Sequence, residues 1–142
     1  MRIFLDANVY FSAARSPQGG SSAVCELIKA KKLVLYTTRD VLHEAERNIR
    51  QKEPISARLR FYELMTTLNA KIVAVGKQNA QLRFAKIINK KDTHVLEGAR
   101  VSKADFLVTL DKKHFQNEKV KRSNLPFAIA SPGELLKKLS QS

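Results

Sequence analysis

Short apolar runs of strand length alternate with longer segments of helical period along the whole chain. The expected strands are 2–5, 33–36, 71–75, 104–110 and 127–130. The expected helices are about 21–31, 40–52, a segment after Pro54, 92–102 and a terminal helix from 131, with one or two helical turns in 79–88. This alternation is typical of a parallel sheet covered by helices. We therefore expect an α/β fold.

Local signals support several of these helices. Ser21 or Ser22 is a suitable N-cap for the first helix, and Ser131-Pro132-Gly133-Glu134 reads as a capping box with proline at the first helical position. The helix after Pro54 has apolar residues at the spacing of a buried stripe. They are Phe61, Leu64, Met65 and Leu68. No repeat, low-complexity segment or linker interrupts the pattern, so residues 1–142 are expected to form one domain.

Acidic side chains occur where the expected sheet would form a site. Asp6 follows the first strand, Asp111 follows the strand 104–110, Asp92 begins a helix, and Glu44 lies one turn into another. Parallel strands end at a common edge, where sites form in open α/β sheets, so these four carboxylates can converge. Converging carboxylates repel one another unless a cation neutralises them. Oxygen ligands without a His or Cys cluster favour Mg²⁺ or Mn²⁺.

The same acids also allow structural interpretations. Asp92 could cap its helix, Glu44 could be an exposed residue paired with a neighbouring arginine, and Asp105 could pair with a neighbouring lysine. Asp6 and Asp111 fit such interpretations least, because each lies directly behind an apolar strand and burial of an unpaired carboxylate is costly. The metal hypothesis is therefore strongest for these two.

Charge and length set further limits. The 142 residues include 26 Lys and Arg against 13 Asp and Glu, a net charge of +13. Such an excess predicts attraction to polyanions, of which nucleic acid is the commonest, although an acidic protein partner could also neutralise it. No apolar stretch approaches the length of a membrane span, and the start MRIFLD resembles neither a signal nor a transit peptide. A cytoplasmic location and no membrane partner are the default expectations.

Two residue types are expected to be structural rather than chemical. Cys25 is the only cysteine and lies in a helix-like apolar run, which indicates a core side chain. His94 and His114 are close to acids in sequence, but a surface or packing role is the simpler interpretation.

Three segments, in order, resemble the PIN-domain family, and within it the toxin-like ribonucleases of the VapC kind. They are FLDANVYFSA, TRDVLHEAERNI and KKDTHVLEGARVSKADFLVTLDKKHF. The first is similar to the family's opening strand and first acid. The second is similar to the helix with the second acid, and the third to the segment with the third acid and the strand that ends in Thr-x-Asp. The resemblance as a whole extends over nearly the whole chain.

The resemblance implies a three-layer α/β/α sandwich around a parallel sheet of four or five strands. It implies catalytic, metal-binding acids at Asp6, Glu44, Asp92 and Asp111. Glu46 competes with Glu44 for the second position. Asp105 matches an acid of one branch of the family and is a further candidate metal ligand. Asn8 and Thr109 are candidates for orienting the carboxylates from behind.

The implied activity is cleavage of single-stranded RNA by a water that Mg²⁺ or Mn²⁺ activates. Lys112 or Lys91 is a candidate for holding backbone phosphates. A toxin of this kind implies a small antitoxin protein that blocks the site, and the family implies a possible homodimer.

Two other classes of function remain as alternatives. A non-catalytic PIN-like module would bind RNA or act as a scaffold, and the loss of an acid would be its sequence mark. An aspartyl nucleophile of the dehalogenase-like phosphatases requires Asp-x-Asp after the first strand, whereas this chain has Asp6-Ala7-Asn8. A response-regulator receiver requires an aspartate after its third strand, where this chain has Gly76 and Lys77. All four candidate positions are acidic, which favours the nuclease.

Overall fold

A parallel sheet of five strands forms the centre of the computed structural model, which describes residues 1–141. The spatial order of the strands is β3-β2-β1-β4-β5. Their bounds are β1 (Arg2–Leu5), β2 (Val34–Thr37), β3 (Lys71–Ile72), β4 (Phe106–Val108) and β5 (Ala128–Ala130). In register, Ile3 pairs with Leu35 on one side and Phe106 on the other. The two strands that precede Asp6 and Thr109 are therefore neighbours, although they lie far apart in the sequence.

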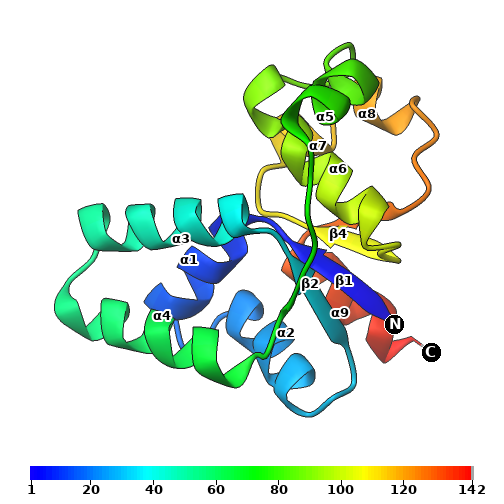
Figure 1. Cartoon of the computed structure of the whole chain (residues 1–142). Helices are drawn as coiled ribbons and strands as arrows, with labels where there is room; N and C mark the ends of the chain where they lie inside the picture. Colours follow the sequence, from blue (N-terminus) through cyan, green and yellow to red (C-terminus); the bar gives the residue numbers. More distant parts are fainter. Residues whose placement is uncertain (142) are drawn as a thin grey trace.

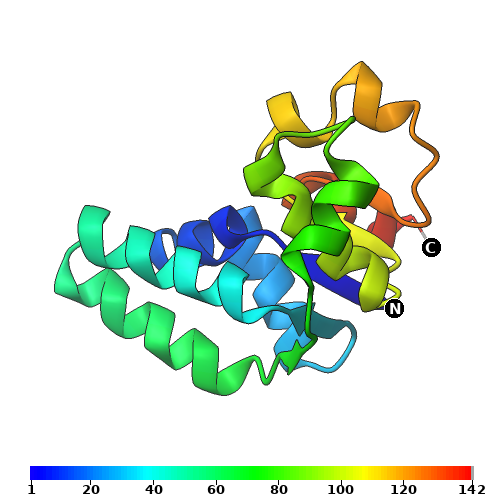
Figure 2. The ribbon, with the colours of Figure 1, turned by 45° about the horizontal axis from the view of Figure 1, so that its top comes forward.

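Helices cover both faces of this sheet (Figures 1 and 2). The α-helices are α1 (Ala7–Arg15), α2 (Gly20–Lys29), α3 (Arg39–Lys52), α4 (Ile55–Thr67), α5 (Lys77–Phe84), α6 (Thr93–Val101), α7 (Lys112–Phe115), α8 (Glu118–Lys121) and α9 (Pro132–Ser140), and η1 (Lys90–Asp92) is a 3₁₀ turn. Helix α6 packs on β1 and β4 with α5 against it, whereas α1 contacts α2, α3 and α4, and α2 contacts α9. This arrangement confirms the expected α/β/α architecture.

The central strand shows why both faces must be covered. Ile3, Phe4 and Leu5 are fully buried, although successive side chains of a strand point to opposite faces. On one face α6 lies so close that a Cβ at Gly98 would come within 2.5 Å of Phe4 Cζ. The position therefore requires glycine for its lack of a side chain rather than for backbone freedom.

Some elements differ from the sequence expectation. Residues 7–15 form helix α1, which the run Val9-Tyr10-Phe11 did not indicate, and α2 begins at Gly20 rather than at a serine cap. The hydroxyl of Ser22 instead donates to the carbonyls of Ala13 and Ser16. Strand β3 contains only two of the five expected residues. The capping box at Ser131 and Glu134 is present as predicted.

The interior is apolar, and Cys25 belongs to it as expected. Its side chain is buried in α2, and burial raises the pKa of the thiol to about 11, so it is protonated at neutral pH. None of the helices between residues 1 and 141 has the length and apolar character needed to cross a bilayer.

Candidate active site

Asp6 lies at the carboxyl end of β1 and caps helix α1. Its Oδ1 accepts from the backbone N–H of Ala7 at 2.8 Å, and its Oδ2 accepts from Thr109 Oγ1 at 2.9 Å and from Asn8 Nδ2 at 3.3 Å. The backbone N–H of Asp6 donates to the Val108 carbonyl at 2.9 Å, which continues the β1–β4 ladder. Both oxygens of the carboxylate are thus held in place from behind and beside.

Asn8 and Thr109 connect this carboxylate to the loop after β4. Asn8 Oδ1 accepts from the backbone N–H of Leu110 at 3.1 Å, and Asn8 Nδ2 also lies 3.3 Å from Thr109 Oγ1. Thr109 Oγ1 in turn accepts from the backbone N–H of Asp111 at 3.1 Å. The two side chains therefore fix the position of Asp111 relative to Asp6.

Asp111 caps the short helix α7 and pairs with His114. Its Oδ1 accepts from the backbone N–H of His114 at 3.1 Å, and its Oδ2 lies 2.8 Å from His114 Nδ1. The sequence analysis assigned His114 no role near an acid. The available signal was its position three residues after a capping aspartate, which is the place where a capping side chain and a helical residue meet.

Glu44 and Asp92 approach the same edge from two further helices. Glu44 is half-buried on α3, and Asp92 directly precedes α6 without a side-chain capping bond. The helix-cap interpretation of Asp92 is therefore not met. Glu46 lines a different cavity with Tyr10 and Tyr62, so of these two glutamates Glu44 is the one that borders the α6 side.

The electrostatics link these acids to one another. Burial raises the pKa of Asp6 to about 6, and the negative charges of Glu44 and Asp92 add to the increase. Burial also raises the pKa of Asp92, with a further increase from Asp111, while Lys91 and His114 oppose the change. Glu44, Asp92 and Asp111 thus each raise the pKa of a neighbouring acid, as expected where carboxylates converge, and no cation is paired with the buried Asp6 within residues 1–141.

A second buried acid shows what a paired carboxylate looks like in this fold. Glu97 lies inside α6 with its Oε1 2.6 Å from Arg100 Nε and 3.2 Å from Arg83 Nε. The hydrogen bond from Arg100 holds the pKa of Glu97 below its usual value. Asp6 has no such ion pair within residues 1–141. Its charge is compensated only by neutral donors.

The donor set suits a hard divalent cation in chemistry, because it consists of carboxylate oxygens at one sheet edge. In the part of the chain that the structure describes, however, no three His, Cys, Asp or Glu side chains form a close ligand group. The four acids therefore lie around a common region but are not close enough together in this structure to share one metal ion.

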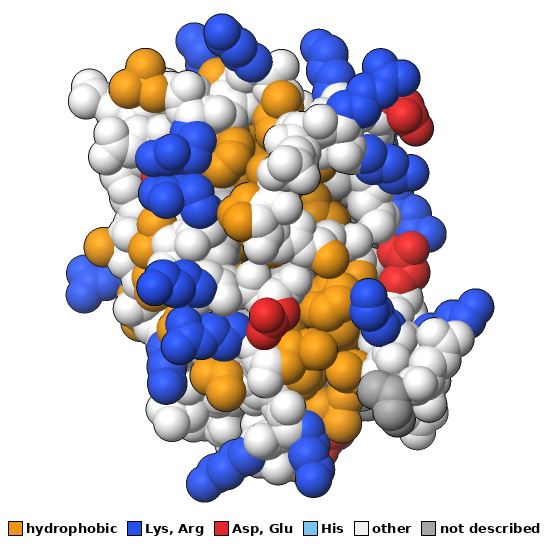
Figure 3. Space-filling model, turned by 90° about the vertical axis from the view of Figure 1, so that its right-hand side faces the viewer, with side chains coloured by type: hydrophobic (Ala, Val, Ile, Leu, Met, Phe, Trp, Pro, Cys, Tyr) orange, Lys and Arg blue, Asp and Glu red, His pale blue; other side chains and the backbone are white. Residues whose placement is uncertain are grey.

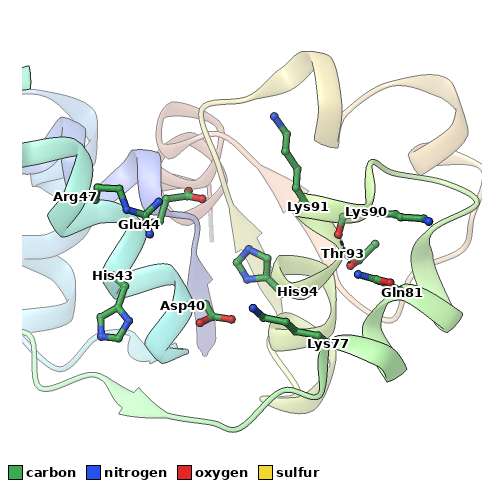
Figure 4. Close-up of a pocket in the computed structure, with 10 residues that line it drawn as sticks. All are labelled: Asp40, His43, Glu44, Arg47, Lys77, Gln81, Lys90, Lys91, Thr93 and His94. Atoms are coloured by element: carbon green, nitrogen blue, oxygen red, sulfur yellow. Dashed lines mark hydrogen bonds between the residues drawn. The ribbon is translucent and has the colours of Figure 1, made fainter. Parts of the chain in front are cut away.

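A cleft of about 390 Å³ opens beside these acids, between α3 and the segment α5–η1–α6 (Figure 4). Asp40 and Glu44 point into it from α3, and Lys77, Gln81 and His94 point into it from the opposite wall (Figure 4). No sequence pattern indicated Asp40, Lys77 or Gln81 as residues of a site. They are polar residues on helix surfaces, and only the packing of α3 across from α5 brings them together.

Asp105 requires a correction. It directly precedes β4, its backbone N–H donates to the Arg2 carbonyl at 2.8 Å, and its Oδ2 accepts from the backbone N–H of Arg2 at 2.8 Å. Because β1 and β4 are parallel and Asp6 lies at their other end, Asp105 is at the opposite edge of the sheet from the acids. It fixes the start of β1 to β4 and is not placed to share a metal ion with Asp6. Its partner is also not the neighbouring lysine.

Two solved structures have a similar fold at low sequence identity. One is VapBC2 from Rickettsia felis, bound to a DNA fragment from its promoter, with a TM-score of 0.68 and 17% identity over 92% of this chain and 98% of that chain. The other is PAE2754 from Pyrobaculum aerophilum, with a TM-score of 0.66 and 14% identity over 100% of this chain and 97% of that chain. No curated protein sequence matches the chain.

The family assignment rests on the sequence. The PIN-domain family profile matches residues 2–113, which contain β1, the helices α1 to α6, β4 and all four candidate acids. With the parallel sheet, its helical layers and the acids at one sheet edge, this match shows that the chain belongs to the PIN-domain family.

Proposed function

We propose that this protein is a metal-dependent ribonuclease that cleaves single-stranded RNA, and that it is the toxin of a toxin–antitoxin pair. The observation that carries the proposal is the electrostatic frustration of Asp6. This buried carboxylate has no cationic partner within residues 1–141, its pKa is raised to about 6, and two of the other candidate acids contribute to that increase. A divalent cation would relieve the repulsion that folding creates.

The roles of the residues follow from their positions. Asp6, Glu44, Asp92 and Asp111 would hold Mg²⁺ or Mn²⁺, which when bound supplies an acidified water and stabilises charge on the phosphate. Thr109 and Asn8 orient the Asp6 carboxylate through the bonds to its Oδ2. His114 holds Asp111 Oδ2 at 2.8 Å. These bonds fix the orientation of the Asp6 and Asp111 carboxylates.

An RNA substrate is supported by the charge of the molecule. Lysines and arginines are spread over the surface seen in Figure 3, with few acids among them, and the net charge is +13. This excess of positive charge would attract an RNA strand to the molecule.

Antitoxin binding is supported by the similarity to VapBC2. That structure is VapBC2 bound to a DNA fragment from its promoter. Because the present chain has a similar fold, an antitoxin protein is proposed as its partner. An antitoxin that blocks the site would need to neutralise the negative charge of the four acids. A basic side chain of the antitoxin is suited to this. A homodimer is a second proposed assembly.

An RNA-cleavage assay with purified protein tests the enzymatic proposal. We expect cutting of an unstructured RNA in Mn²⁺ or Mg²⁺, no cutting in EDTA, and loss of at least two orders of magnitude in rate for Asp6→Asn. Asp105→Asn is the matched control, because its carboxylate lies at the opposite sheet edge and the Asn side-chain oxygen can still accept from Arg2. Full activity of Asp6→Asn, or activity in EDTA, would contradict the proposal.

One observation favours an alternative, a PIN-like module that binds RNA without cleaving it. In residues 1–141 no three potential ligands form a close metal-binding group. Calorimetric titration of the protein with Mn²⁺ distinguishes the two functions. Binding that disappears in Asp6→Asn supports the nuclease, whereas RNA binding without any Mn²⁺ binding supports the module.

A further inference from the structure

The cleft between α3 and the segment α5–η1–α6 has two chemically different walls. From α3, Asp40 and Glu44 point into it; from the other wall come Lys77, Gln81 and His94 (Figure 4). Its volume of about 390 Å³ is in the range of small-ligand sites. A site with both hydrogen-bond acceptors and cations matches a ligand that carries both donors and negative charge.

His94 is a side chain without a hydrogen-bond partner in this cleft. Its Nδ1 atom is buried and bonds to no other atom of the described residues, although most buried polar atoms in proteins are paired. No hydrogen bond from Nδ1 to the described residues therefore competes with a ligand for this ring. Histidine rings also provide a flat surface on which an unstacked base can lie.

The turn that leads to His94 is held rigidly. Asn89 Oδ1 accepts from the backbone N–H of Lys91 at 3.1 Å, and Thr93 Oγ1 donates to the Lys90 carbonyl at 2.8 Å. Lys91 and Lys77 reach the cleft region on two sides of His94, whereas Lys90 points away (Figure 4). The Lys77 ammonium group thus lies beside His94, and the Lys91 side chain extends away from the ring on the other side, where the next phosphate of a bound strand would pass (Figure 4).

We propose that this cleft is a subsite for one nucleotide of single-stranded RNA. The base lies against His94, Gln81 bonds to its edge, Asp40 accepts from its exocyclic amino group, and Lys77 and Lys91 hold the flanking phosphates. The identification of the ligand as RNA rests on the proposed function, in which the acids beside the cleft act on RNA. The subsite adds to that function a selectivity for the base.

The chemistry of the Asp40 wall determines the preferred base. A carboxylate is a suitable partner for the amino group of cytosine and repels the carbonyl that uracil carries at the same position. Cytosine and uracil are otherwise alike in size and stacking area. The subsite is therefore expected to bind a cytosine-containing strand more tightly than the corresponding uracil strand.

Binding of fluorescent hexanucleotides C6 and U6 in EDTA tests this subsite without requiring cleavage. For the wild-type protein we expect C6 to bind about tenfold more tightly than U6. Asp40→Asn should remove that preference, and Gln81→Ala and His94→Ala should weaken both strands severalfold. Lys77→Gln and Lys91→Gln should weaken both strands equally, because phosphates carry no base information.

Gln78→Ala is the matched control, since Gln78 is exposed on the same helix as Gln81 and does not line the cleft. Equal binding of C6 and U6 by the wild-type protein, or a preference that Asp40→Asn retains, overturns the inference. Unchanged binding in both Gln81→Ala and His94→Ala overturns it as well. A protein that shows the preference in EDTA but never cuts in Mn²⁺ would overturn the proposed function and leave the subsite standing. A protein that cuts RNA in Mn²⁺ but binds C6 and U6 equally would support the proposed function and overturn the subsite.

Discussion

Asp6 differs from an ordinary aspartate because folding makes its charged form unfavourable. Burial raises its pKa from 3.8 to about 6, with smaller contributions from Glu44 and Asp92. A carboxyl whose pKa rises on folding stabilises the fold fully below the unfolded pKa, and this contribution is lost as the pH rises through the folded pKa. The sensitive window therefore runs from about pH 4 to pH 7.

This window gives a prediction for the metal-free protein. Between pH 4 and pH 7 in EDTA, the free energy of unfolding of the wild type should fall relative to that of Asp6→Asn by about 3 kcal/mol. Urea denaturation at several pH values measures this difference, and any constant effect of the substitution cancels. With Mn²⁺ present, the wild type should regain stability as the pH rises through 6, because metal competes with the proton. A difference that stays flat across the window would contradict the assignment.

Thr109 gives a second prediction at the scale of the residue. Its hydroxyl donates to Asp6 and accepts from the backbone N–H of Asp111, so Thr109→Val leaves both groups without that partner. We expect a loss of about 1 to 3 kcal/mol in stability and at least a tenfold loss of RNA cleavage. Thr66→Val on the exposed face of α4 removes a hydroxyl bonded only to the Glu63 carbonyl, and should leave cleavage unchanged. Equal activity of the two variants would show that Thr109 does not position the acid.

The positions of individual acids could be predicted from the sequence where an apolar run marked the end of a strand. Asp6 and Asp111 follow apolar strands, and the parallel sheet brings such strand ends to one edge. Asp105 was misplaced because the resemblance assigned it by type, whereas the direction of β4 puts the start and the end of that strand on opposite edges. His114 was not assigned to the site although its partner Asp111 lies only three residues away. Gln81 was not assigned because only the packing of α3 across from α5 brings it to the cleft.

At the scale of the element, helix α6 can pack closely on β1 because Gly98 has no side chain. A Cβ at Gly98 would lie 2.5 Å from Phe4 Cζ and 2.6 Å from Phe4 Cε2, closer than atoms can approach. Both partners are in the rigid interior, so α6 must shift away from β1 if a methyl group is added. Asp92, which directly precedes α6, would shift with it.

Gly98→Ala is therefore expected to lower the free energy of unfolding by about 1 to 3 kcal/mol, as overpacked cores do. The expected gain in helix propensity is smaller than this cost. Gly133→Ala is the control, because the nearest atom to its added methyl group would be Ser131 Oγ at 4.0 Å, an ordinary van der Waals contact. Chemical denaturation of both variants provides the comparison. A neutral effect of Gly98→Ala would mean that α6 and β1 are less tightly packed than the structure shows.

Prediction of the elements succeeded where a local signal determines the structure. The capping box of α9 was identified from four residues, because the cap requires only neighbouring groups. Helix α1 was missed since Val9, Tyr10 and Phe11 favour strands in isolation, and burial against α3 and α4 decides their conformation. Strand β3 was overestimated because only two of its residues pair with β2.

At the scale of the molecule, the positive charge is expected to make the proposed RNA binding dependent on salt. A net charge of +13 and a strand held at two or three phosphates predict a fall in log affinity of about 1.5 to 2 for each tenfold increase in salt. Titration of a labelled single strand in EDTA at 50 to 500 mM KCl measures the slope. An affinity independent of salt would show that the basic surface does not contact the phosphates.

The order of the strands in the sheet also has a consequence for how the protein is made. Asp6 is among the first residues synthesised, yet its hydrogen-bond partner Thr109 follows a strand that pairs with β1 only after more than a hundred further residues. During translation the first acid, and later Glu44, therefore emerge from the ribosome without Asp92 and Asp111. The four acids come together only when β4 joins the sheet. If the chain has the proposed ribonuclease activity, it would therefore carry no assembled site beside the ribosome's own RNA for most of its synthesis.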